Sequence, residues 1–241
     1  MNIAEETARI LGLLRAQGGP ERAENEKRYL KSDFTHLGVP VPVIRKASRS
    51  PVRTRADALG LAASLWAVTE EGRPVHEARM AAVEVLIRHG ALLEPADLAV
   101  AERMIRDSAS WVYVDMLAEK VAGRLVVRHP ALAATLDVWA ADPYPWIRRS
   151  ALLALLPGIR AGTPDLARIS RYGDALIEES GFFIRKALGW VLRELSKKDP
   201  DWVINWLAPR TGKVSGVTLR EALRYLQPEA ATKLQAAYKA R

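Results

Sequence analysis

The chain has 241 residues, and its 36 Lys and Arg exceed its 28 Asp and Glu, so the formal net charge is +8. Hydrophobic residues make up 49% of the chain, which is enough for a folded core and excludes a disordered protein. Because no cysteine is present, the sequence excludes a disulfide scaffold, a cysteine zinc site, an iron–sulfur cluster and a thiol nucleophile.

The spacing of apolar residues predicts helices along the whole chain. Apolar residues recur at helical intervals, and no sustained alternation of apolar and polar residues indicates a strand. We expect helices over residues 3–16, 21–31, 41–48, 55–67, 75–89, 95–107, 111–127, 131–141, 146–156, 164–178, 182–197, 200–207, 218–226 and 229–240. The gaps between them are short, so the sequence predicts one domain over residues 1–241.

Several short motifs predict helix ends. The segments 163–165 (Thr-Pro-Asp) and 199–201 (Asp-Pro-Asp) each offer an N-cap residue followed by proline at the first helical position. Thr218 and Glu221 have the spacing of a capping box. The Pro-Gly pair at 157–158 predicts a helix stop.

No segment of the sequence predicts export or a membrane span. Glu5 and Glu6 near the start, without a basic stretch before them, argue against a signal peptide. The longest uncharged, apolar-rich run covers residues 58–69 and is far shorter than the ~20 residues that a span needs. We therefore expect a protein of the cytoplasm.

The aromatic composition favours a nucleic-acid partner. The chain has seven Trp and only three Phe, although Trp is the harder residue to bury because its N–H needs a partner. A basic chain with surplus Trp suits a polyanion whose bases also stack. The alternative is that the Trp residues fill the core and the charge only aids solubility.

A short basic motif recurs at the start of three predicted helices. It reads Ile-Arg-Lys-Ala at 44–47, Ile-Arg-Arg-Ser-Ala at 147–151 and Ile-Arg-Lys-Ala at 184–187, and the last two copies lie 37 residues apart with one helix between them. Helix pairs at this period predict an all-α superhelix, a solenoid of HEAT-like repeats. Its concave face would then be basic and could follow a phosphate backbone. The copies supply the candidate DNA-binding residues Arg45, Lys46, Arg148, Arg149 and Lys186.

The predicted helix 182–197 separates into an apolar stripe and a basic face. Lys186, Trp190, Arg193 and Lys197 recur at helical spacing nearly opposite the apolar stripe. An exposed Trp among cations is costly unless a ligand or a neighbouring repeat covers it. We therefore interpret Trp190 as a ligand-binding residue and Arg193 and Lys197 as further DNA-binding residues.

Two residues on other helices are harder to place. Asp115 lies one turn after Trp111, and a carboxylate in a basic groove would repel a polyanion unless chemistry requires it. A lone Asp on a helix is otherwise usually solvated. Arg149 shares its face with Leu153 and Leu156, which predicts partial burial.

Several kinds of enzyme site are absent from the sequence. It contains no phosphate-binding loop, no dinucleotide-binding glycine fingerprint, no His-Glu-x-x-His motif and no nucleophile elbow. His36, His76, His89 and His129 show no ligand spacing, so we expect no metal site and no cofactor. An enzyme of this composition would work with carboxylate, aromatic and basic side chains.

Five segments together resemble one known family. They are residues 27–46 (KRYLKSDFTHLGVPVPVIRK), 110–115 (SWVYVD), 146–153 (WIRRSALL), 182–203 (FFIRKALGWVLRELSKKDPDWV) and 219–223 (LREAL). In this order they resemble the AlkD family of bacterial alkylpurine DNA glycosylases, over most of the chain. The resemblance implies a superhelix of HEAT-like repeats with a concave, DNA-binding face, and hydrolysis of the N-glycosidic bond of N3- or N7-alkylated purines.

The resemblance also assigns roles to residues. It implies that Asp115 is the catalytic carboxylate and that Trp111 and Trp190 flank the lesion, without a deep pocket for a flipped base. It implies that Arg149 binds a phosphate beside the site and that Tyr29 approaches the DNA. The implied partner is double-stranded DNA with alkylated bases, bound by a monomer in the bacterial cytosol or nucleoid.

Some positions depart from the family pattern and bear on lesion preference. Family members often carry a second Trp before the position of Trp111, where this chain has Ser110, and Val112 and Tyr113 replace more polar residues. Two alternatives stay open. One is a non-catalytic relative that binds damaged or branched DNA, and the other is a protein-binding helical scaffold.

Overall fold

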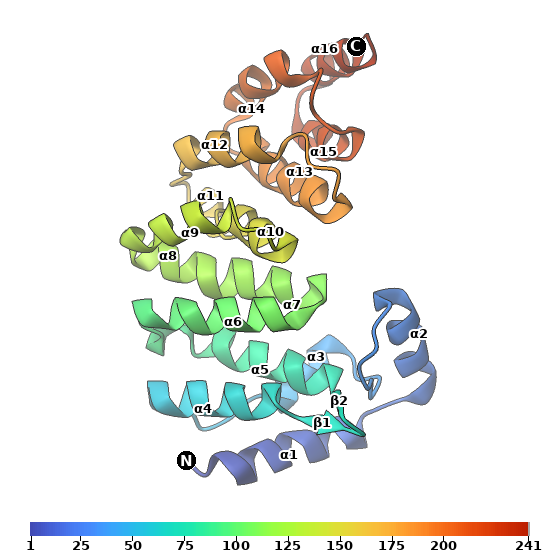
Figure 1. Ribbon diagram of the computed structural model, residues 1–241, viewed down its shortest axis with the longest axis vertical. Coiled ribbons are helices and arrows are strands. Elements are labelled where there is room, and N and C mark those ends of the chain that lie inside the picture. The colour runs from blue at the N-terminus through green and yellow to red at the C-terminus, as the bar shows by residue number, and fades with distance from the viewer. Residues whose placement is uncertain (241) are drawn as a thin grey trace. The chain divides into compact units, whose positions relative to one another are not determined.

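The computed structural model describes residues 1–240, which are mainly helical, and this confirms the predicted all-α class (Figure 1). The contacts within the chain divide it into two compact units, Met1–Asp97 and Leu98–Arg241, although the sequence shows no boundary there. A single domain over residues 1–241 stays a prediction. Among the described residues, no helix is both long and apolar enough to cross a membrane.

The first unit contains helices α1 to α5 and one short hairpin. Helix α5 is buried along its length, from His76 to Leu86, because α1, α3 and α4 pack against it. Helix α5, which the apolar spacing predicts over residues 75–89, is therefore the central helix of this unit. The elements are α1 (Ile3–Ala16), α2 (Pro20–Leu30), α3 (Val41–Ala47), α4 (Arg55–Trp66), β1 (Thr69–Glu70), β2 (Arg73–Pro74) and α5 (His76–Arg88), followed by 3₁₀ turns at Gly90–Leu92 and Pro95–Asp97.

The hairpin between α4 and α5 is a feature that the sequence does not predict. Thr69 pairs with Pro74 and Glu70 pairs with Arg73 in an antiparallel ladder. Gly72 in the turn has φ 76, a conformation that suits tight hairpins and that glycine adopts without strain. Strands of two residues are too short to show an alternating pattern, which explains the missed prediction.

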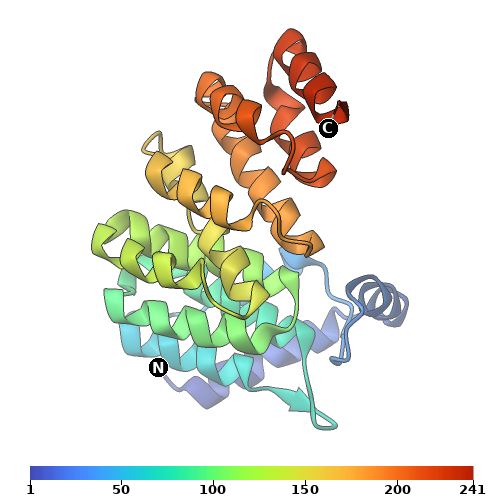
Figure 2. The ribbon, with the colours of Figure 1, turned by 45° about the horizontal axis from the view of Figure 1, so that its top comes forward.

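The second unit continues as successive helices that pack on one another (Figure 1). Helices α12 and α13 lie side by side in both ribbon views (Figure 2). The elements are α6 (Leu98–Ser108), α7 (Trp111–Met116), a π-helical segment (Leu117–Gly123), α8 (Arg124–Arg128), α9 (Ala133–Trp139), α10 (Pro145–Leu153), α11 (Leu156–Arg160), α12 (Leu166–Leu176), α13 (Phe182–Ser196), α14 (Pro200–Leu207), α15 (Gly216–Ala222) and α16 (Pro228–Lys239), with 3₁₀ turns at Pro130–Leu132, Ala208–Arg210 and Leu223–Tyr225.

Helix α10 forms the centre of the second unit. Ile147, Ala151, Leu152 and Leu153 are all 0% exposed. Helices α6, α7, α9 and α13 pack around α10, so its apolar residues are covered on nearly every side. Burial of each of the three larger side chains contributes about 1.5–3 kcal/mol relative to exposure. The position of α10 is therefore strongly determined by packing.

Of the two predicted Pro-containing helix starts, one is confirmed and the other is displaced by two residues. Asp199 caps α14, because its side chain accepts the Trp202 N–H at 3.0 Å and Pro200 occupies the first turn. Thr163 is wrong as a cap, because α12 begins later and Asp165 accepts the Arg168 N–H at 2.9 Å.

The other two predicted helix ends are wrong. Ser215 caps α15 by accepting the Thr218 N–H at 3.1 Å, so Thr218 is inside the helix and buried. The capping-box spacing was misleading because an earlier serine does the capping. The Pro-Gly pair at 157–158 does not stop a helix, since Pro157 lies in the first turn of the short helix α11, where proline is tolerated.

The predicted helix 111–127 is continuous but changes its winding. It widens to a π-helix over Leu117–Gly123 directly after α7. π-Helical turns are rare and are frequent near functional sites. A Cβ on Gly123 would come within 2.6 Å of the Ala154 carbonyl oxygen, so glycine allows this helix to approach the end of α10 closely. The spacing of apolar residues in the sequence does not reveal this change from α-helical to π-helical winding after α7.

Helices α13 and α15 also approach closely at a glycine. A Cβ on Gly189 would lie 2.8 Å from the Glu221 Cβ and 3.1 Å from the Thr218 Cα. Only a residue without a side chain fits this crossing. The close approach brings Glu221 of α15 to the side of α13 that carries Arg193.

Candidate functional site

Asp115 and Arg149 form an ion pair between α7 and α10. The Arg149 Nε donates to one carboxylate oxygen of Asp115 at 2.7 Å, and Nη2 donates to the other at 2.8 Å. The Arg149 side chain is 3% exposed and that of Asp115 is 17% exposed. The guanidinium is therefore buried, while the Asp115 side chain is partly exposed. Two parallel hydrogen bonds fix the orientation of the carboxylate.

The predicted burial of Arg149 is confirmed, and most of its N–H donors already have a partner within the protein. Its Nη1 donates to the carbonyl oxygen of Phe183 at the start of α13. With the two bonds to Asp115, this uses three of the five N–H donors of a guanidinium. The phosphate contact of Arg149 stays a prediction, and two N–H groups are left for it.

The surroundings of Asp115 act on its pKa in opposite directions. Burial raises the pKa of the carboxyl above its usual value, because a charged group is poorly solvated there. The hydrogen-bonded Arg149 lowers this pKa and Glu119 raises it. The net direction is upward, so the guanidinium only partly offsets the cost of burial. The charge of Lys186 makes a smaller contribution that also lowers the pKa of Asp115.

The two candidate tryptophans lie on different helices of the second unit. Trp111 begins α7 and lies one turn before Asp115, so the two side chains share a side of the helix. Trp190 lies on α13, and the Arg193 guanidinium carbon is 6.0 Å from its ring centre. Both tryptophans are half-buried. Trp190 is thus less exposed than its position opposite the apolar stripe suggests.

A group of aromatic residues beside the ion pair was not singled out from the sequence. Phe182 and Phe183 begin α13, are 54% and 37% exposed, and contact each other edge to face at 5.5 Å between ring centres. Trp146 lies 4.9 Å from Phe183 by the same measure, and the Arg149 guanidinium carbon lies 5.7 Å from the Phe183 ring. The sequence signal that could have identified this group is the pair of consecutive aromatic residues at the start of the predicted helix 182–197.

The cations of α13 have different surroundings. The Lys186 ammonium lies 5.8 Å from the Phe182 ring, and Lys186 is exposed. Arg193 forms an ion pair with Glu221 of α15. Lys197 is paired with Glu194 at 2.7 Å, and its ammonium lies 4.6 Å from a tyrosine ring. Carboxylates therefore interrupt the basic face predicted for this helix.

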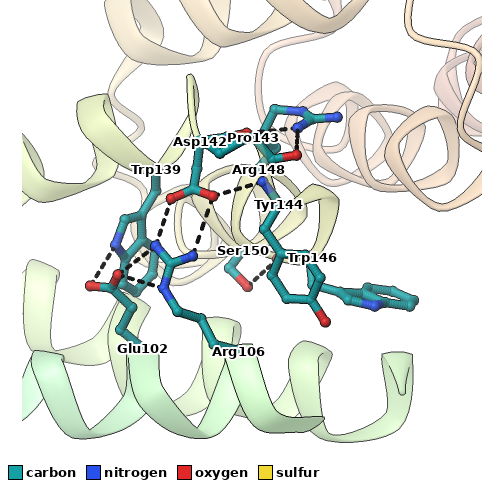
Figure 3. A network of polar contacts seen from close by, with 9 residues as sticks. All are labelled: Glu102, Arg106, Trp139, Asp142, Pro143, Tyr144, Trp146, Arg148 and Ser150. Atoms are coloured by element: carbon teal, nitrogen blue, oxygen red, sulfur yellow. Dashed lines mark hydrogen bonds and ion pairs between the residues drawn. The ribbon is translucent and has the colours of Figure 1, made fainter. Parts of the chain in front are cut away.

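Arg148 is bound to the loop that precedes α10 (Figure 3). Its Nη1 donates to the carbonyl oxygens of Asp142 at 2.6 Å and Pro143 at 2.9 Å. Its Nε is paired with a carboxylate oxygen of Glu179 at 2.7 Å. The contact of Arg148 with DNA stays a prediction, and these contacts show that it also holds the start of α10.

The same loop is joined to α6 by a second arginine (Figure 3). Arg106 pairs with Asp142 at 2.6 Å and with Glu102 at 2.8 Å. Glu102 in turn accepts the indole N–H of Trp139 at 3.1 Å. Trp139 is 1% exposed and therefore a core residue, and its N–H has the partner that a buried indole needs.

Three of the predicted DNA-binding residues belong to the first unit. Tyr29 on α2 is 74% exposed. Arg45 on α3 is exposed and is paired with the buried Glu84, with Nη2 at 2.9 Å and Nε at 3.0 Å from one carboxylate oxygen and Nε at 3.1 Å from the other. Lys46 follows it and is exposed. Their contact with DNA stays a prediction.

The fold and the site together define a class of protein. It is a helical-repeat protein that presents one partly exposed carboxylate beside aromatic and basic side chains. Residues 10–226 match the model of a family described as DNA alkylation repair enzyme. The chain belongs to this family. Membership implies an enzymatic role in DNA repair, with DNA as the partner.

One solved structure is similar over most of the chain. It is described as a predicted DNA alkylation repair enzyme from Enterococcus faecalis, is 23% identical, and matches with a TM-score of 0.77. The match covers 88% of this chain and 98% of that one. At this identity the likeness supports the fold. No curated protein matches this chain.

Proposed function

We propose that the protein is a monofunctional DNA glycosylase that removes cationic N3- or N7-alkylated purines from double-stranded DNA, as the resemblance to the AlkD family implies. The observation that carries the proposal is the Asp115 carboxylate. It is held by the buried Arg149, lies one turn after Trp111 and belongs to a side chain that is partly exposed. The ion pair fixes the orientation of this carboxylate, and its partial exposure would allow a deoxyribose to approach it.

The proposed reaction needs only water. Alkylation at N3 or N7 makes the purine cationic and therefore a good leaving group. The C1′–N bond breaks, its electron pair leaves with the base, and the sugar acquires oxocarbenium character. The Asp115 carboxylate stabilises this positive charge and orients a water whose oxygen bonds to C1′. The water proton passes to Asp115 and then to solvent, and the products are the neutral base and an abasic site.

The tryptophans complete the proposed site. Trp111 and Trp190 would flank the lesion, and a cationic base is attracted to an indole face by about 0.5–2 kcal/mol. Because the leaving group is already charged, no acid is needed to protonate it, which is why one carboxylate suffices. Contact with the lesion through its sugar and phosphates, without a deep base pocket, would also admit bulky adducts.

DNA binding in this proposal depends on cations of both units. The second unit contributes Arg148, Arg149, Lys186, Arg193 and Lys197. The net charge of +8 favours association with a polyanion, and each neutralised phosphate releases counterions, so affinity should fall steeply with salt. The first unit contributes Arg45, Lys46 and Tyr29, and a monomer would bind one lesion.

The test is base release from alkylated DNA. Wild-type protein is incubated with DNA carrying 7-methylguanine or 3-methyladenine and with DNA carrying bulky N7 adducts, and the freed bases are quantified. Release by wild type and its loss in Asp115→Asn supports the proposal. Equal release by both proteins contradicts the role of Asp115.

A second candidate is a non-catalytic protein that binds damaged or branched DNA. The observation in its favour is that Asp115 already has a strong partner in Arg149, as a purely structural residue would. Tight, structure-specific binding without release of any base would favour this candidate. Weak binding that does not depend on salt would contradict both candidates.

A further inference from the structure

Three potential metal ligands from separate parts of the sequence meet in the first unit. They are Glu26 on α2, His36 in the loop before α3, and His76 at the start of α5. One ligand atom from each residue lies within 4.8 Å of the other two. The sequence predicts no metal site because its histidines show no ligand spacing. The fold nevertheless brings two of them together, with ring centres 4.4 Å apart.

Several polar atoms of this cluster lack a hydrogen-bond partner within the described chain. Both ring nitrogens of His36 are buried without one, and so is the Oε2 atom of Glu26. A buried polar group left unsatisfied costs about 1–3 kcal/mol. Three such atoms, two on one ring and one on the facing carboxylate, are more than packing alone explains. A cation would satisfy at least one on each residue.

Both imidazoles are in the form that binds metals. Burial lowers the pKa of His36 and of His76 to about 4, and His76 lowers that of His36 further. Both rings are therefore uncharged at neutral pH, and a neutral imidazole is the metal ligand. Burial raises the pKa of Glu26, while Arg22 lowers it and holds its other oxygen at 2.6 Å.

The loop that carries His36 is fixed by the residue next to His76. Glu77 is fully buried and accepts the N–H groups of Leu37 at 2.9 Å, Gly38 at 2.7 Å and Val39 at 3.2 Å. On the other side, the His76 N–H donates to the Thr35 carbonyl oxygen at 2.9 Å. The two histidines are thus positioned by hydrogen bonds outside the cluster, as in metal sites whose ligands are preorganised.

We propose that Glu26, His36 and His76 bind one divalent transition-metal cation, with Zn²⁺ the best match to two imidazoles and a carboxylate. Two histidines and one glutamate are a ligand set that zinc accepts, with a fourth position left for water. Mg²⁺ and Ca²⁺ prefer oxygen ligands only. Binding requires the two rings, which stack within 13° of parallel, to tilt so that their lone pairs converge.

The cation would tie α2 to the core of the first unit. Helix α2 contains no fully buried residue, whereas α5 is buried along most of its length. A bond network from Glu26 through the metal to His76 would join the two helices directly. The bound state would therefore be more resistant to unfolding, and α2 would gain the most protection.

The experiment uses the full-length, untagged chain after treatment with a chelator. Zn²⁺ is added, and binding is measured by calorimetry, together with the shift in melting temperature. Co²⁺ serves as a spectroscopic probe of nitrogen ligation. We expect one equivalent per chain, a rise in melting temperature, and a loss of affinity of at least about tenfold in His36→Gln, His76→Gln and Glu26→Gln. The matched control is His129→Gln, a histidine in the second unit, which should bind as wild type does.

Two results would overturn the proposal. One is that wild type does not bind one equivalent of Zn²⁺. The other is that His129→Gln loses as much Zn²⁺ affinity as the variants of Glu26, His36 and His76 do. If a cluster variant fails to fold, NMR of the histidine side chains of wild type tests the proposal instead. Added Zn²⁺ should shift the signals of His36 and His76 and leave those of His89 and His129 unchanged. Unshifted signals of His36 and His76 would contradict the site.

Discussion

The Arg149 guanidinium holds both carboxylate oxygens of Asp115, although the two residues are 34 positions apart in the sequence. The arginine is buried and the aspartate side chain is partly exposed. This pair fixes where the carboxylate points and influences its charge.

Asp115→Asn should abolish most base release. The amide cannot supply negative charge to an oxocarbenium-like sugar, and loss of one preorganised electrostatic group costs about 10²- to 10³-fold in rate. Single-turnover release of 7-methylguanine measures the effect. DNA affinity should stay within a few-fold of wild type, and a parallel loss of affinity would mean that the variant is misfolded or that Asp115 is structural.

A double-mutant cycle should show strong coupling between Asp115 and Arg149. Removing one partner of a buried pair leaves the other uncompensated and typically costs about 3–5 kcal/mol of folding stability. We expect Arg149→Met to be strongly destabilising and Arg149→Met with Asp115→Leu to recover part of the loss. Chemical denaturation of the four proteins measures the coupling energy. Additive losses would show that the pair does not act as a unit.

The pH dependence of activity and of stability should have opposite signs at Asp115. Burial raises the pKa of its carboxyl, so the ionised, active form is lost at a higher pH than for an ordinary aspartate. A folded pKa above the unfolded value favours the protonated native state. The contribution of Asp115 to stability is therefore present below the unfolded pKa and is lost as pH rises through the folded pKa.

The pH prediction is measured with rates and melting temperatures from pH 4 to 8, for wild type and Asp115→Asn. The acidic inflection in rate should lie above the usual aspartate range in wild type. In Arg149→Gln it should move to still higher pH, because the guanidinium that lowers this pKa is gone. An unchanged inflection in that variant would contradict the electrostatic coupling.

Trp190→Ala and Trp111→Ala should weaken catalysis toward cationic lesions. Loss of one cation–π contact of about 0.5–2 kcal/mol corresponds to about 2- to 30-fold in rate. Trp190→Phe should retain part of the activity, since it keeps an aromatic face. The informative comparison is a neutral lesion such as an abasic-site analogue, whose binding should change less. Equal losses for charged and neutral ligands would argue against a cation–π role.

Lys186 should act through phosphate attraction and not as a nucleophile. Lys186→Ala should reduce DNA affinity for all sequences and lower the slope of log affinity against log salt by about 1. The control is Lys198→Ala, an exposed lysine just beyond α13. Borohydride should trap no covalent complex of wild type with lesion DNA. A trapped adduct that is lost in Lys186→Ala would instead show a Schiff-base lyase.

The all-α fold class follows from the amino-acid sequence alone. Helical spacing of apolar residues is a local property, so it located the helices. It also predicted the burial of Arg149, from the helix face that it shares with leucines. Helix ends were less accurate, because the choice between Ser215 and Thr218 as a cap depends on which side chain reaches a free N–H.

Contacts between side chains of different helices become visible in the folded structure. No local pattern joins Asp115 to Arg149, or His36 to His76, because these contacts depend on how one helix packs against another. The same holds for the π-helical turn after Asp115, which ends at the closely packed Gly123 and lies in a helix whose apolar spacing looks regular. Periodicity records the burial of single residues, whereas a site depends on pairs brought together by the fold.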